Sequence, residues 1–204
     1  MGSWPTTGIA VLATALCCLA TEDTRRLKFS ECLDTRGDNI YGHNATELVS
    51  GNSIQMSGYT YQYKQLNALV RSFPHLKILA FPCHQFGHQE PGNESEILAG
   101  LKHVRPGGGF RPRFPLTSKT EVNGENEAPL YSFLKRSCPP TTDVIGNSSN
   151  LYFSPIKVTD VTWNFEKFLV DASGVPRFRF HPSVEPTEIV DFIEGLLFER
   201  ARNQ

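Results

Sequence analysis

The stretch KILAFPCHQFGHQEPG, residues 77–92, places a short apolar run directly before a proline and a polar loop. The run itself, residues 77–81, has the length and composition of a buried β-strand. Beyond the Pro-Gly pair that ends the stretch, Asn93 and Glu96 stand three positions apart, as the N-cap and capping box of a helix do. The stretch therefore predicts a strand, a loop and a helix in that order.

Apolar residues recur at regular spacing through the rest of the chain. Helical spacing is found at residues 63–70, 97–104, 130–134 and 189–197, and short apolar runs at 167–170 and 175–180 flank a turn at 171–174. In the second of these runs Phe178 and Phe180 face one way, whereas Arg177, Arg179 and His181 face the other. These patterns predict one α/β domain without repeats or linkers.

The composition, 39% hydrophobic and 20% charged over 204 residues, is that of a globular protein. Twenty Lys and Arg against 21 Asp and Glu leave a formal net charge of −1. No overall charge therefore attracts the protein to nucleic acid or to an anionic membrane surface. Any anion-binding site must be a local cluster.

The first residues have the pattern of a secretory leader. The apolar run GIAVLATALCCLA, residues 8–20, is followed at once by charged residues, and it is shorter than the ~20 residues that a membrane-spanning helix needs. A membrane anchor is the alternative interpretation, and secretion is favoured. We expect residues 1–20 to be a signal peptide and residues 21–204 to form a single domain.

The cysteines and sequons agree with an extracellular protein. Two cysteines lie in the leader, which leaves Cys32, Cys83 and Cys138, so at least one of the three is free or pairs between chains. No C-x-x-C motif occurs, which argues against a zinc ribbon or a thioredoxin-type dithiol, and no metal is expected. Three N-x-S/T sequons begin at Asn44, Asn93 and Asn147 and predict a glycoprotein.

Four motifs in a fixed order carry a family resemblance. They are FPCHQFGHQEPG at 81–92, RPGGGF at 105–110, VNG at 122–124 and WNFEKFLV at 163–170. Together they resemble the glutathione peroxidases from Tyr59 to the C-terminal helix. The resemblance implies a thioredoxin-like fold, and hydrogen peroxide and organic hydroperoxides as substrates. It also implies a selenol or thiol that is oxidised by the hydroperoxide and returned by glutathione or another thiol, with no further cofactor.

The resemblance also assigns the supporting residues of such a site. Gln89, Trp163 and Asn164 occupy positions whose side chains donate hydrogen bonds to the reactive anion and favour its charged form. Without the family, the same residues would be interpreted as a loop amide, a core aromatic and a turn residue. Cys83 matches a structural position and is expected to be a buried apolar residue.

Two arginines and a long loop concern substrate and assembly. Arg105 and Arg179 match positions that hold the glutathione carboxylates in tetrameric family members, which suits a guanidinium. For Arg177, on the same predicted strand as Arg179, a solvated side chain is the alternative interpretation. Residues 128–161 resemble the longer loop of that tetrameric branch, which predicts a homo-oligomer, most simply a tetramer.

The family pattern breaks at the reactive position. Ser57, in the run SGYT at 57–60, stands where the family has selenocysteine or cysteine, and the strand that should precede it is absent from the sequence. A serine hydroxyl is un-ionised at neutral pH and forms no oxidised state like sulfenic acid. The fold prediction is therefore a thioredoxin-like domain with one central strand missing.

Three interpretations of function follow. The first is a peroxidase that responds to oxidative stress and whose active form includes the absent segment. The second is a catalytically silent, secreted peroxidase-like binding protein or a truncated splice product, and the third is a non-enzymatic subunit of an oligomer. A serine hydrolase using His84 or His88 with Glu90 lacks a nucleophile-elbow motif.

Overall fold

The computed structural model describes residues 28–43 and 59–202. The leader at 1–20, the sequon at Asn44 and the reactive position Ser57 lie outside the described residues. The elements, in chain order, are β1 (Phe29–Glu31), η1 (Ile40–Gly42), α1 (Gln62–Ser72), α2 (Glu94–His103), α3 (Pro129–Ser137), η2 (Ser148–Asn150), β2 (Lys167–Val170), β3 (Pro176–Phe180), η3 (Pro186–Ile189) and α4 (Val190–Arg202). All four helices predicted from the spacing are confirmed.

Helix α2 begins where its sequence predicts. The Asn93 side chain accepts a hydrogen bond from the backbone N–H of Ser95 at 3.1 Å, and the Glu96 carboxylate accepts one from the backbone N–H of Asn93 at 2.7 Å. These bonds satisfy donors that a helix start leaves without partners. The capping box is thereby confirmed.

A small antiparallel sheet has the strand order β1-β3-β2. The hairpin predicted around 171–174 is confirmed, with Asp171 Oδ1 accepting from the backbone N–H of Ser173 and Val175 and with Gly174 at φ +83°. Phe180 enters a core cluster with Leu69 of α1 and Ile193 of α4. The neighbouring Arg179 contacts Cys138 and Asp160 instead, as the alternation predicts.

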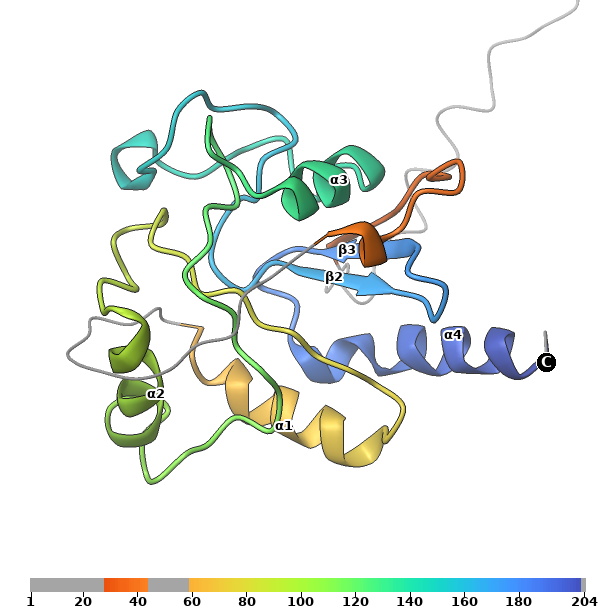
Figure 1. The fold of residues 1–204 in the computed structure, drawn as a ribbon, viewed down its shortest axis with the longest axis horizontal. Helices are drawn as coiled ribbons and strands as arrows, with labels where there is room; N and C mark the ends of the chain where they lie inside the picture. The colour runs from red at the N-terminus through yellow and green to blue at the C-terminus, as the bar shows by residue number, and fades with distance from the viewer. Residues whose placement is uncertain (1–27, 44–58, 203–204) are drawn as a thin grey trace, which may run out of the picture.

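Helices cover both faces of this sheet. Figure 1 shows α3 on one side of β2 and β3, and α1 with α4 on the other. The apolar residues of α3, Leu130, Phe133 and Leu134, pack against Phe81 and Phe168. Helix α1 is central, because Tyr63 packs with residues of α2 and Leu69 packs with residues of the sheet and α4.

The prediction of a β-strand at residues 77–81 is wrong, because these residues do not form a strand ladder with the described part of the chain. Only Ala80 forms a bridge, to Leu116, with its N–H donating to Pro115 O at 3.1 Å and its carbonyl accepting from Thr117 N–H at 2.8 Å. A β-strand is stabilised by a ladder of partners, and residues 77–81 have no second partner among the described residues. Within the described residues, the apolar run is therefore extended chain with a single bridge rather than a strand.

Two of the three cysteines outside the leader form a disulfide. Cys32, which follows β1, forms a disulfide with Cys138, which ends α3, across a sequence separation of 106 residues. Cys83 is free and buried. In the described part of the chain, no helix is long and apolar enough to cross a membrane.

Candidate active site

Two loops bring the predicted site residues together. The loop after Phe86 turns sharply, with Gly87 and His88 both at positive φ, near +60° and +51°, and Gly87 N–H donates to Asn150 O at 2.8 Å. Positive φ suits glycine and is uncommon for histidine. Gln89 follows this turn, and its backbone N–H donates to Phe86 O at 3.2 Å.

The second loop precedes β2. Glu166 accepts hydrogen bonds from the backbone N–H of Thr162 at 2.7 Å and from its hydroxyl at 2.8 Å, and so closes the turn that carries Trp163 and Asn164. Phe165 in this turn has φ +66°, an uncommon conformation for a bulky residue. Such outliers persist where the surrounding structure fixes them.

Gln89 and Asn164 are in direct contact. Asn164 Nδ2 donates to Gln89 Oε1 at 3.1 Å, across 75 residues of sequence. This bond fixes the orientation of the Gln89 amide, whose Nε2 has no protein acceptor in the described part of the chain. Trp163 packs half-buried on Phe86, with ring centroids 5.7 Å apart. The three residues assigned by resemblance thus come from two loops that meet.

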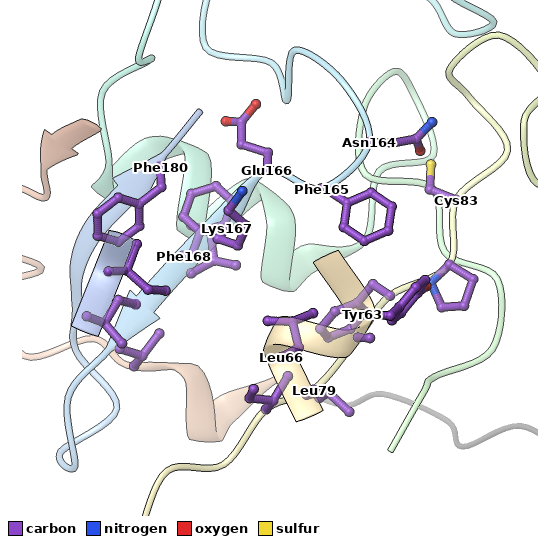
Figure 2. A pocket seen from close by; sticks show the side chains of 18 of the residues that line it. Tyr63, Leu66, Leu79, Cys83, Asn164, Phe165, Glu166, Lys167, Phe168 and Phe180 are labelled. Carbon is purple, nitrogen blue, oxygen red and sulfur yellow. The ribbon is translucent and has the colours of Figure 1, made fainter. Parts of the chain in front are cut away.

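The Gln89–Asn164 pair lies at one end of a cavity of about 340 Å³. Figure 2 shows Asn164 and Cys83 on one wall and Phe168 and Phe180 on the other. Thr60, two positions before α1, lines the same cavity. Ser57 precedes Thr60 by three positions in sequence but lies outside the described residues.

Glu90 also lines the cavity, and sequence reasoning did not assign it a role there. Burial raises the pKa of its carboxyl to about 7. Its Oε1 is buried without a hydrogen-bond partner, and so is Nδ1 of His84, whose ring stacks on that of His88 at 4.4 Å. The signal in the sequence was a carboxylate next to Gln89, but nothing in the sequence indicated its burial.

Cys83 is not a substitute for the missing redox residue. Burial raises the pKa of its thiol to about 11, so the thiol is protonated at neutral pH and is a poor nucleophile. Its sulfur lies 3.5 Å from Gln85 Oε1. The prediction that Cys83 is buried in an apolar environment is confirmed.

The two predicted carboxylate-binding arginines have different surroundings. Arg105 is exposed and follows the last residue of α2 by two positions. Arg179 is fully buried: it forms an ion pair with Glu166 and donates to the carbonyls of Cys138, Thr159 and Asp160. Each of the three nitrogens of the Arg179 guanidinium thus has an internal partner. The binding of glutathione by Arg179 stays a prediction. The guanidinium of Arg179 is not accessible to solvent in this structure.

Lys167 is a further buried cation, at the start of β2. Its Nζ donates to Gln62 Oε1 at 3.1 Å and to the carbonyls of His181, Pro182 and Val184. Burial lowers the pKa of this amine to about 7. Since its donors are taken by α1 and by the segment after β3, Lys167 ties three elements together. Within residues 28–43 and 59–202, no three His, Cys, Asp or Glu side chains gather as metal ligands do.

Comparison with known proteins decides the family. The sequence model of the family described as glutathione peroxidase matches residues 32–135, about half of the chain. This chain belongs to the glutathione peroxidase family. Its helices packed on both faces of a small sheet agree with that family, and the predicted α/β fold of glutathione peroxidase type is confirmed.

Relatives of this chain include glutathione peroxidases 3 and 6. Glutathione peroxidase 3 of Sapajus apella is 54% identical over 132 residues, 64% of this chain and 58% of the relative. Glutathione peroxidase 6 of Mus musculus is 51% identical over 163 residues, 78% and 73% of the two chains. That of Rattus norvegicus is 43% identical over 188 residues, 81% and 84%. The match thus spans 58% of the length of glutathione peroxidase 3.

A solved structure, the crystal structure of T. cruzi GPX1, is 28% identical and covers 82% of this chain and 93% of its own, with a TM-score of 0.46.

Proposed function

We propose that the site is built for the thiol-dependent reduction of hydrogen peroxide and organic hydroperoxides, with glutathione or another thiol as reductant and no further cofactor. The observation that carries this proposal is the hydrogen bond between Asn164 and Gln89 at the end of the cavity. This bond uses Gln89 Oε1, and Gln89 Nε2 has no protein acceptor among the described residues. A group that stabilises an anion needs such a free donor.

The chemistry needs a thiolate or selenolate at position 57. That anion attacks the O–O bond of a hydroperoxide, which releases an alcohol or water and leaves a sulfenic or selenenic acid. A first thiol then forms a mixed disulfide with loss of water, and a second thiol displaces the residue in its reduced form. Gln89, Trp163 and Asn164 would lower the pKa of the attacking group by donating hydrogen bonds to its charged form.

Ser57 supports a second candidate for this particular chain, a catalytically silent binding protein or a truncated splice product. Serine offers neither an accessible anion nor an oxidisable atom. The alignment with the rat relative runs over 188 positions, whereas 81% of 204 residues is about 165, so about 23 positions have no counterpart in this chain. This deficit supports the loss of a segment as well as of the redox atom.

We further propose an extracellular, glycosylated protein that assembles as a homo-oligomer. The Cys32–Cys138 disulfide suits an oxidising compartment. Asn93 and Asn147 are exposed, and each uses its Oδ1 as a cap acceptor. Arg105 is the exposed cation that we propose for binding a glutathione carboxylate.

Peroxide-dependent oxidation of glutathione by the purified chain tests the proposal. The wild-type chain should show no turnover above the uncatalysed rate, and Ser57→Cys should gain peroxide consumption that depends on glutathione. Ser57→Ala is the matched control and should behave as wild type does. Robust turnover by the wild type would refute the silent candidate, and an inert Ser57→Cys with a native-like fold would refute the peroxidase site.

A further inference from the structure

The cavity that ends at Gln89 and Asn164 continues as an apolar slot between two stretches of backbone. One wall is β2, and the other is the extended chain at 77–83. Helix α1 contributes Leu66 and Leu69 on one face of the slot, and α3 contributes Leu130 and Leu134 on the other. Figure 2 shows Leu66 and Leu79 at one side of the slot and Phe168 and Phe180 across from them.

The first wall has an open backbone edge. Strand β2 pairs with β3 on one side and, within residues 28–43 and 59–202, has no strand on its other side. In an antiparallel pair, alternate residues direct their N–H and C=O groups away from the partner. Part of the backbone of β2 therefore faces the slot without a strand partner in the described part of the chain.

The second wall is open as well. Ala80 directs its N–H and C=O to residues 115–117, which lie outside the lining of the slot. Because groups alternate along an extended chain, those of Leu79 and Phe81 face the opposite side. Neither residue makes a backbone hydrogen bond to the described part of the chain. Two rows of peptide groups that have no backbone partner among residues 28–43 and 59–202 thus border one apolar space.

The side chains around the slot set the chemistry of an occupant. Both faces are lined by aliphatic and aromatic residues, so a strand placed there would be buried on both faces and must be apolar on both. Of the ionisable groups in the lining, Glu166 pairs with Arg179 and Lys167 donates to three carbonyls. Lys77 is exposed, and Glu90 directly follows Gln89 at the end of the cavity. Hydrocarbon alone would leave the peptide groups of both walls unsatisfied, which costs free energy.

We propose that this slot binds an extended, uncharged, apolar strand of another polypeptide, which pairs with the open edge of β2 and with residues 77–81. Binding of this kind adds a strand to a sheet, with affinity from main-chain hydrogen bonds and selectivity from side-chain pockets. The proposal is independent of the peroxidase chemistry, because it uses the walls of the slot and not the reactive position.

Titration of the full chain with a synthetic peptide tests the proposal. The probe has a core of about six Val, Leu and Phe residues, the length of an ordinary strand, with lysines at both ends for solubility. Its control has the same side chains but N-methylated peptide groups, which cannot donate. Calorimetry should show saturable binding of the probe, at least about tenfold weaker binding of the control, and hydrogen-exchange protection of the Leu79 and Phe81 amides with the probe.

A protein variant locates the binding. Leu79 is 47% exposed at the edge of the slot, so Leu79→Glu should fold and weaken probe binding by about tenfold or more. Val158→Glu makes the same change at a residue that is 81% exposed and outside the slot, and should bind as wild type does.

Several outcomes would overturn the proposal. Equal binding of the probe and the N-methylated control would show an apolar cavity without strand pairing. Absence of binding would show that the slot accepts no strand of another polypeptide. Other residues of this chain, or a second copy of it, would then be the occupant. Equal loss of binding in Leu79→Glu and Val158→Glu would place the peptide elsewhere.

Discussion

Asn164 and Gln89, 75 residues apart in sequence, share a hydrogen bond of 3.1 Å between Nδ2 and Oε1. The bond joins the turn before β2 to the loop after Phe86, and it orients a glutamine amide at the end of an apolar cavity. The two loops that carry the proposed anion-stabilising residues are thus held together by this bond.

The first prediction concerns Gln89. In a Ser57→Cys background, Gln89→Ala should lower the second-order rate of the introduced thiol with hydrogen peroxide by about tenfold, because one hydrogen bond to an anion is lost. Gln65→Ala is the matched control, since Gln65 bonds to Glu185 and does not line the cavity. Stopped-flow measurement of peroxide loss gives both rates. Equal rates for the two variants would show that Gln89 does not act on position 57.

The second prediction concerns pH. The pKa of Glu90 is raised to about 7 by burial, so the folded state binds more protons than the unfolded state between the ordinary carboxyl pKa, near 4.5, and pH 7. The free energy of unfolding should fall as pH rises through this window, with the loss complete above pH 7. Glu90→Gln removes the effect, and its stability advantage should reach about 1–2 kcal/mol at pH 8. Urea unfolding at pH 4.5, 6 and 8 measures this. A constant difference between the two proteins across that range would contradict the burial of Glu90.

The third prediction separates two neighbouring arginines. Arg179→Met leaves Glu166 buried without its partner and should cost about 3–5 kcal/mol of unfolding free energy. Arg177 is partly exposed and pairs with Glu199 at 2.9 Å, so Arg177→Met should cost at most about 1 kcal/mol. Urea unfolding at pH 7 compares the two. Similar small losses would show that Arg179 is available to solvent, and would favour its predicted role in substrate binding.

The fourth prediction concerns the disulfide. Cys32 and Cys138 close a loop across 106 residues, so Cys138→Ser should lower the free energy of unfolding by about 2–5 kcal/mol.

Peptide mapping after alkylation of the native protein should find Cys83 unmodified, because it is buried and its thiol pKa is raised. Alkylation after denaturation should modify it. Rapid native labelling of Cys83 would contradict its position.

The local elements could be predicted because their signals are local. The capping box of Asn93 and Glu96 and the turn at 171–174 depend on residues that are close in sequence. The strand at 77–81 could not, because a strand needs a partner, and an apolar run carries no information about whether that partner is present. The pattern reasoning assigned the correct face of β3 to Arg179 but could not identify Glu166 as its partner.

The candidate site also has a part that could be predicted from the sequence and a part that could not. The resemblance assigned Gln89, Trp163 and Asn164, and the structure brings the two loops that carry them together. Burial of Glu90 and the joining of Cys32 to Cys138 follow from tertiary packing, which no spacing in the sequence encodes.

The most direct test of the central claim is the pKa of a thiol placed at position 57. It is obtained from the pH dependence of the alkylation rate of Ser57→Cys, with Cys83 protected by its burial. A site that keeps its anion-stabilising residues predicts a thiol pKa clearly below the ordinary value of about 8.5. A pKa at or above that value would show that Gln89, Trp163 and Asn164 do not act on this position, and would contradict the account.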